Sequence, residues 1–110
     1  DNWFRPVHFQ PTQGKYNGED CEGVQVHVTD RPALHPVRTG LEVVRSVRQL
    51  WADDFAWRIP DGGIHNFDRL AGSDGIRKAI DAGTPVVDIL NADRLGQEGF
   101  LQTRCRYFRY

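Results

Sequence analysis

The heptapeptide GVQVHVT, residues 23–29, carries the clearest structural pattern in the chain. Its three valines, Val24, Val26 and Val28, alternate with polar residues. Because successive side chains of a β-strand point to opposite faces, the valines share one face and the polar side chains share the other. The stretch therefore predicts a β-strand, and the sequence around it indicates what this strand pairs with.

A second strand is predicted upstream, over Phe4–Gln10, where Val7 and Phe9 alternate with polar residues. Pro6 and the following Pro11 confine this strand to the edge of a sheet, because proline has no N–H to donate to a ladder. The residues between the two strands, 12–22, are polar and rich in turn formers. The pattern predicts a β-hairpin with a long tip, and a loop held on two strands is a favourable place for binding chemistry.

The chain after the hairpin is predicted to be mostly helical. Thr39 and Glu42 have the spacing of a capping box, and an apolar stripe follows them to about Ala52. The first helix is therefore expected to begin at Thr39. Residues 53–66 contain a Pro-Asp-Gly-Gly turn and are expected to be irregular.

Three shorter helices are predicted in the C-terminal part. One begins at Ser73 and stops at Gly83, the next begins at Thr84–Pro85, and the last covers about Arg94–Tyr107. Two strands followed by helices predict an α+β fold, a small sheet built on an N-terminal β-hairpin with several helices packed on one face. The periodicity also predicts one shared core, formed by Val24, Val26, Val28, Val44, Val47, Leu50, Ile76 and Ile80.

Length and composition restrict the class of protein. The 110 residues are enough for a single domain, 1–110, and 39% hydrophobic with 26% charged residues is ordinary for a globular fold. The formal charge is −1 without a basic patch, so we expect no nucleic-acid partner. The apolar runs are short, so we expect no membrane span. Cys21 and Cys105 form no CxxC motif, which favours two free thiols, with a disulfide as the open alternative.

Several segments together carry a resemblance to a known family. They are PVHFQPT (6–12), KYNGE (15–19), CEGVQVHVTDR (21–31), PVRTGL (36–41), FDRLAGSD (67–74) and the closing spacing of Phe100, Arg104, Tyr107 and Tyr110. In this order they resemble the second domain of the exo-β-N-acetylmuramidase (NamZ-type) glycoside hydrolases over nearly the whole chain. Two positions depart from that pattern, since an aromatic residue is expected at Gln13 and a tryptophan at Asp93.

The resemblance implies a part of a two-domain enzyme that removes terminal N-acetylmuramic acid from the non-reducing end of peptidoglycan fragments. In such enzymes the catalytic acidic residue is expected in a larger, Rossmann-like N-terminal domain, which this sequence lacks. The chain is then an accessory domain, inactive alone, that packs against the catalytic domain and walls the substrate cleft. Its expected partners are that domain and a peptidoglycan-derived sugar, without a cofactor, in the cell envelope or outside the cell. The alternative is a free-standing glycan-binding or adaptor domain.

Five residues are predicted to bind substrate: Lys15, Tyr16 and Glu19 in the tip, and Gln25 and His27 on the polar strand face. A sugar site needs an aromatic ring and a few placed hydrogen-bonding groups, and the lactyl carboxylate of muramic acid needs a cation, which Lys15 supplies. The ordinary interpretation stays open for each group. Lys15 can be a solvated loop residue with Tyr16 covering the core, and alternation alone does not separate a cleft-facing strand face from a solvated one.

No catalytic residue and no metal site are predicted within this chain. Glu19, Glu22 and Asp30 lie near the hairpin, but carboxylates beside turns are usually turn formers or solubilising groups. A glycosidase needs two of them about 5 to 10 Å apart across the scissile bond. The residues that could bind a metal show no HxxxH or CxxC spacing; they are His8, His27, His35, His65 and Cys21.

The number of large rings predicts a docking face. Six rings in so small a chain exceed what its core readily hides, so an exposed apolar patch beside the hairpin is expected to meet another domain. They are Trp3, Phe4, Tyr16, Trp51, Phe55 and Trp57.

Overall fold

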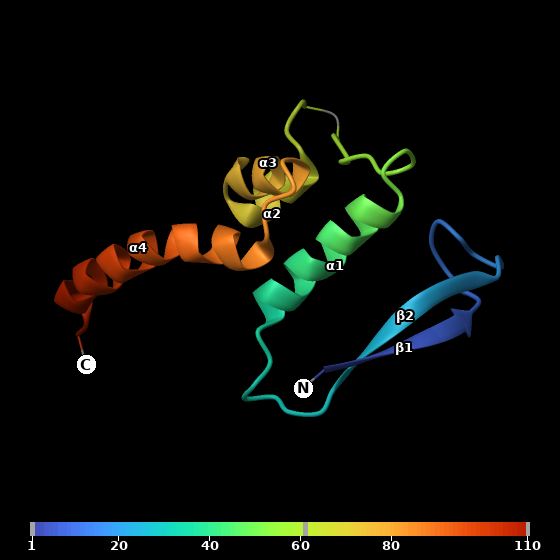
Figure 1. Ribbon diagram of the computed structural model, residues 1–110, viewed down its shortest axis with the longest axis horizontal. Helices are drawn as coiled ribbons and strands as arrows, with labels where there is room; N and C mark the ends of the chain where they lie inside the picture. Colours follow the sequence, from blue (N-terminus) through green and yellow to red (C-terminus); the bar gives the residue numbers. More distant parts are fainter. Residues whose placement is uncertain (1, 61, 110) are drawn as a thin grey trace. The chain divides into compact units, whose positions relative to one another are not determined.

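A computed structural model describes residues 2–60 and 62–109 of the chain (Figure 1). The chain forms two compact units, residues 1–36 and residues 37–110. The first contains two strands and the second contains four helices, so the predicted α+β class is confirmed. The packing of helices on one face of the sheet stays a prediction.

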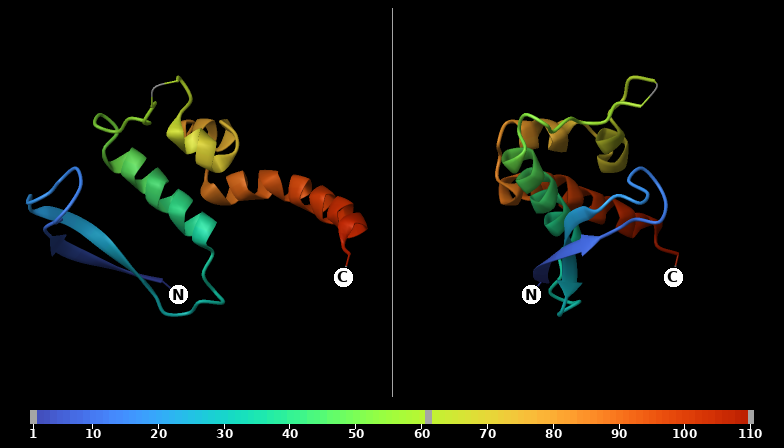
Figure 2. Two further views of the ribbon diagram at one scale, coloured as in Figure 1. Left: turned by 180° about the vertical axis from the view of Figure 1, so that it is seen from behind. Right: turned by 90° about the vertical axis from the view of Figure 1, so that its right-hand side faces the viewer.

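The first unit is a β-hairpin (Figures 1 and 2). Strand β1 (Asn2–Phe9) pairs antiparallel with β2 (Cys21–Val28), in a register that runs from Phe9 opposite Cys21 to Asn2 opposite Val28. Both predicted strands are confirmed, with each boundary within two residues. Pro6 is tolerated in β1 because both strands of a two-stranded sheet are edge strands.

The register sorts the side chains of the hairpin into two faces. Residues that lie directly opposite each other in an antiparallel pair project to the same side. The apolar face consists mainly of Phe4, Pro6, Val24, Val26 and Val28, with His8 and Glu22 at its tip end. The polar face consists of Trp3, Arg5, Gln25 and His27, with Val7, Phe9, Cys21 and Gly23 toward the tip.

The second unit contains four helices: α1 (Pro36–Leu50), α2 (Asn66–Ala71), α3 (Gly75–Asp81) and α4 (Val86–Arg104), followed by a 3-10 turn, Cys105–Tyr107. The C-terminal part of α4 extends beyond the other three helices in every view (Figures 1 and 2). None of the helices in the described part of the chain combines the length and apolar character required to cross a lipid bilayer.

Three helix predictions were wrong in detail. Helix α1 begins at Pro36 rather than at Thr39, because a first-turn proline has a favourable φ and needs no hydrogen-bond donor. Helix α2 was not predicted; it begins at Asn66, the last residue of the stretch expected to be irregular. Helix α4 is continuous, so the two separate helices predicted around Arg94 are one, and Gly96 does not interrupt it.

The buried core lies in the second unit. Its fully buried members are Leu41, Ile80, Val86 and Ile89. The partly buried residues packed against them are Val44, Trp57, Phe67, Ile76, Ala79 and Leu90. The core prediction is therefore confirmed for Ile80 and in part for Val44 and Ile76.

The core prediction is not confirmed for the end of α1, and for the hairpin valines, whose burial depends on contact with the helical unit, it stays a prediction. Val24, Val26 and Val28 are 62%, 43% and 42% exposed, and Val47 and Leu50 are exposed as well. A two-stranded hairpin has no second layer of its own, so alternation makes an apolar face without burying it. Among the six large rings, the exposure of four is confirmed, whereas two are partly buried. The exposed rings are Trp3, Phe4, Tyr16 and Trp51; the partly buried rings are Phe55 and Trp57.

The conspicuous FDRLAGSD motif, residues 67–74, has a structural role. Asp68 accepts hydrogen bonds from Nε of Arg77 at 2.8 and 3.0 Å, and the two side chains are only 10% and 14% exposed. Gly72 ends α2 in a left-handed conformation, φ 82°, with its N–H donating to the carbonyl of Asp68. The motif therefore ends α2, turns the chain and ties α2 to α3.

Candidate binding site on the hairpin

The tip of the hairpin is held by a series of tight turns. Gly18 N–H donates to the Pro11 carbonyl at 2.8 Å, and the Gln10 amide donates to the Gly18 carbonyl at 2.8 Å. Gly14 and Gly18 have φ values of 90° and 79°, a region that favours glycine. The tip is therefore a shaped loop whose backbone positions the side chains between its glycines.

Lys15 and Tyr16 lie together on this loop. The Lys15 ammonium sits 5.1 Å from the centroid of the Tyr16 ring, within the range of a cation–π contact. Tyr16 is 49% exposed, and Glu19, whose N–H donates to the Tyr16 carbonyl at 3.1 Å, is exposed too. The tip presents a cation, an aromatic ring and a carboxylate to the surroundings of the hairpin unit.

Gln25 and His27 lie two residues apart on the polar face of β2. Nε2 of His27 is 3.2 Å from Oε1 of Gln25, a hydrogen bond in which the histidine nitrogen donates. Gln25 lies four residues beyond the start of β2, about 13 Å along an extended strand. The five predicted binding residues thus form two groups, one at the tip and one farther along the strand, rather than a single cluster.

The register adds two residues that the sequence interpretation missed. Arg5 lies opposite Gln25, and Trp3 lies opposite His27, on the same polar face. Both residues could have been found from the alternation of β1 combined with the strand register. That register depends on the number of residues in the tip. The two strands bring together an indole, a guanidinium, an amide and an imidazole, all on the exposed part of the hairpin.

The carboxylates near the hairpin have local partners. Glu22 lies 3.6 Å from Nδ1 of His8, with both side chains more than 80% exposed. Asp30 accepts a hydrogen bond from the N–H of Ala33 at 3.3 Å, the turn-forming role expected for it. Within residues 2–60 and 62–109, no three His, Cys, Asp or Glu side chains are grouped so that they could hold a metal ion. Cys21 and Cys105 are free thiols in the same described residues.

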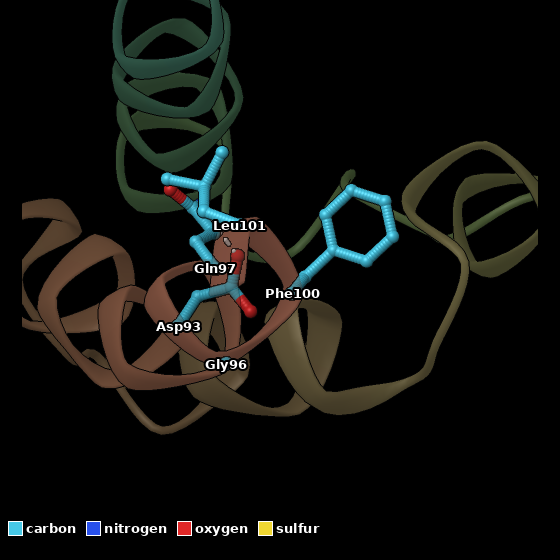
Figure 3. Close-up of a pocket in the computed structure, with 5 residues that line it drawn as sticks. All are labelled: Asp93, Gly96, Gln97, Phe100 and Leu101. Carbon is cyan, nitrogen blue, oxygen red and sulfur yellow. Dashed lines mark hydrogen bonds between the residues drawn. The ribbon is translucent and has the colours of Figure 1, made fainter. Parts of the chain in front are cut away.

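Two hollows are lined by residues of the helical unit and by none of the predicted binding residues. One, about 570 Å³, is formed by α2, α3 and the preceding loop and is lined by His65, Asp68, Arg69 and Arg77 among others. The second, about 350 Å³, lies along α4 (Figure 3). It is lined by Asp93, Gly96, Gln97, Phe100 and Leu101, and the Gln97 amide donates to Asp93 at 2.8 Å. Asp93 is the position at which the family resemblance predicts a tryptophan.

The fold and the hairpin define a small α+β domain, and comparison with known proteins gives its family. Residues 2–110 match the family described as "Exo-beta-N-acetylmuramidase NamZ, C-terminal". The chain is also 39% identical over 107 residues to the "Peptidoglycan beta-N-acetylmuramidase NamZ" of Bacillus subtilis (strain 168). That match covers 97% of this chain and 25% of the relative. No solved structure matches the chain significantly. The chain belongs to the NamZ C-terminal domain family.

Proposed function

We propose that the chain is an accessory domain of an exo-acting β-N-acetylmuramidase that releases terminal N-acetylmuramic acid from peptidoglycan fragments. The observation that carries the proposal is the family match over residues 2–110, together with a relative of which the chain spans only 25%. The rest of such an enzyme supplies a Rossmann-like catalytic domain. The domain described here walls the substrate cleft and contributes binding groups to it, without a catalytic residue of its own.

The hairpin supplies the chemistry for this role. Tyr16 offers a ring for stacking on a sugar, and Lys15 beside it offers a positive charge for an acidic substrate. Gln25 and His27 offer an amide and an imidazole on one strand face, suited to sugar hydroxyl and acetamido groups. These groups are exposed on a hairpin whose strands fix their spacing, which suits a surface that completes a cleft with another domain.

The test exchanges domains between this chain and its relative. A hybrid carries this chain in place of the matching 107 residues of the B. subtilis protein, and a truncated form lacks those residues. We expect the hybrid to release N-acetylmuramic acid from a chromogenic glycoside, the truncated form to lose most of that activity, and the isolated chain to be inactive. Thermal unfolding of the hybrid checks that both parts are folded.

Each contrary result has a defined meaning. A folded hybrid no more active than the truncated form contradicts the accessory role. Steady turnover by the isolated chain that is abolished by Glu19→Gln or Glu22→Gln places catalysis in this domain instead. A truncated form that keeps full activity, with an isolated chain that binds peptidoglycan sugars, supports the alternative of a free-standing glycan-binding domain.

A further inference from the structure

The polar face of the hairpin holds a cation without an acidic partner. Arg5 has no carboxylate within ion-pair distance among the residues that the structure describes, and its side chain is exposed. Several other basic residues are engaged: Arg48 pairs with Asp81 at 3.3 Å and Arg77 with Asp68 at 2.8 Å. Arg5 is therefore available for an anion that the hairpin does not itself provide.

The surroundings of Arg5 are suited to a sugar. Gln25 lies opposite it, and the Trp3–His27 pair follows two residues along, about 7 Å away at the rise of a β-strand. On the tip side, the Phe9 ring lies across β2 beside Gly23, where an added Cβ would be 3.1 Å from the Phe9 ring. The face thus has an aromatic ring at each end and the Arg5–Gln25 pair between them.

A guanidinium beside an amide recognises a carboxylate better than a lone ammonium does. Arginine presents parallel N–H donors that match the two oxygens of a carboxylate, whereas lysine acts as a point charge. The ammonium of Lys15, the cation predicted for this task, is already directed at the Tyr16 ring. The exposed Trp3 indole, 69% accessible, adds a large face for the apolar side of a pyranose.

We infer that the polar face binds an N-acetylated sugar acid of the muramic type, with Arg5 and Gln25 on its lactyl carboxylate and Trp3 stacked on its ring. The choice of this sugar rests on the proposed function, and the assignment of its carboxylate to Arg5 rests on the position of that guanidinium opposite Gln25 and beside the Trp3–His27 pair. Arg5 is then a residue that determines specificity between muramic acid and N-acetylglucosamine, which has the same ring and acetamido group but no carboxylate.

The experiment is an NMR titration of the ¹⁵N-labelled 110-residue chain with the two sugars in parallel. N-acetylmuramic acid is expected to shift the backbone amides of Arg5 and Gln25 and the Trp3 indole, and to bind more tightly than N-acetylglucosamine. Arg5→Gln is expected to weaken binding of N-acetylmuramic acid about fivefold to tenfold and to leave N-acetylglucosamine unchanged. Trp3→Ala should weaken both sugars alike.

Two control variants sharpen the result. Arg38→Gln removes an exposed arginine of α1, and Arg31→Gln removes an exposed arginine that follows β2; both should leave the two titrations unchanged. Dispersed hairpin amide signals in each variant show that the strands still pair. The inference is overturned if no amide of this face shifts up to about 20 mM sugar. It is overturned equally if the two sugars bind alike, or if Arg31→Gln lowers the preference as much as Arg5→Gln does.

This outcome is separable from that of the domain exchange. A functional hybrid combined with a titration in which Arg5 has no effect leaves the accessory role intact and removes the role of Arg5. A preference for the sugar acid that depends on Arg5, found together with an inactive hybrid, supports the role of Arg5 and contradicts the accessory role.

Discussion

The hairpin and the helical unit differ in how much of each is buried. The four buried residues and the least exposed ion pair, Asp68–Arg77, belong to the helical unit. In the hairpin the side chains of both faces are largely exposed, and its ion pair, His8–Glu22, is open to solvent. A substitution in the helical unit should therefore change the free energy of unfolding, whereas one on the hairpin should change ligand binding at nearly constant stability.

The largest expected effect is on the core of the helical unit. Ile80 is 3% exposed, and Ile80→Ala removes buried methyl groups and leaves a cavity, so it should lower the free energy of unfolding by about 3 kcal/mol. Urea unfolding measures this loss. The matched control is Val24→Ala, on a side chain that is 62% exposed, with an expected cost below about 0.5 kcal/mol. A Val24→Ala cost close to that of Ile80→Ala would support the single shared core that alternation predicts. It would contradict the difference in burial between the two units.

The next effect concerns the tie between α2 and α3. Arg77→Gln removes the donor from the Asp68 carboxylate, which is 10% exposed and would be left without its ionic partner. The same contact raises the pKa of Arg77, so the arginine stays charged at all ordinary pH values. We expect the thermal midpoint to fall by a few degrees, less than for Ile80→Ala. Lys78→Gln breaks the exposed Asp74–Lys78 pair and should lower the thermal midpoint much less. Equal effects of the two variants would show that the Asp68–Arg77 contact stabilises the fold no more than an exposed ion pair does.

The sequence predicted the hairpin well because a period of two is a local property. The strand at residues 23–29 and its partner were placed to within two residues, and the α+β class followed from them. The tip and strand residues Lys15, Tyr16, Glu19, Gln25 and His27 were named from the family resemblance, and their role stays a prediction. Arg5 was missed because its position opposite Gln25 depends on the strand register, which is set by the geometry of an eleven-residue tip between Phe9 and Cys21.

The helical unit was predicted less well because several of its boundaries depend on contacts that are distant in sequence. Helix α2, six residues long, was not predicted. Its link to α3 comes from Asp68 and Arg77, nine residues apart. Burial of the hairpin valines stays a prediction for a related reason. Alternation shows which side chains share a face, but only a second packed layer buries that face.

A third prediction tests whether a residue of the hairpin tip affects substrate binding rather than stability. In the domain-exchange hybrid, Lys15→Ala should raise KM about threefold with little change in kcat, because an exposed cation at the tip strengthens binding of an acidic substrate without taking part in bond cleavage. The thermal midpoint should stay within about one degree of the parent hybrid. Steady-state kinetics measures the first quantity and Arg38→Ala serves as the control. A lower midpoint with unchanged KM would make Lys15 a structural residue of the tip.

The smallest effect is a pH dependence confined to the helical unit. The hydrogen bond and charge of Lys78 hold the pKa of Asp74 below its usual value of 3.8. A carboxyl group whose pKa is lower in the folded chain stabilises it only while ionised, so this contribution is complete above pH 3.8 and is lost as the pH falls through the folded-state pKa. The stability difference between the parent chain and Asp74→Asn should therefore stay constant from about pH 8 to pH 5 and shrink below about pH 4. Lys78→Gln should flatten the same part of the profile, because it removes the cause of the shift. A difference that changes between pH 5 and pH 8 would assign the effect to a group other than Asp74.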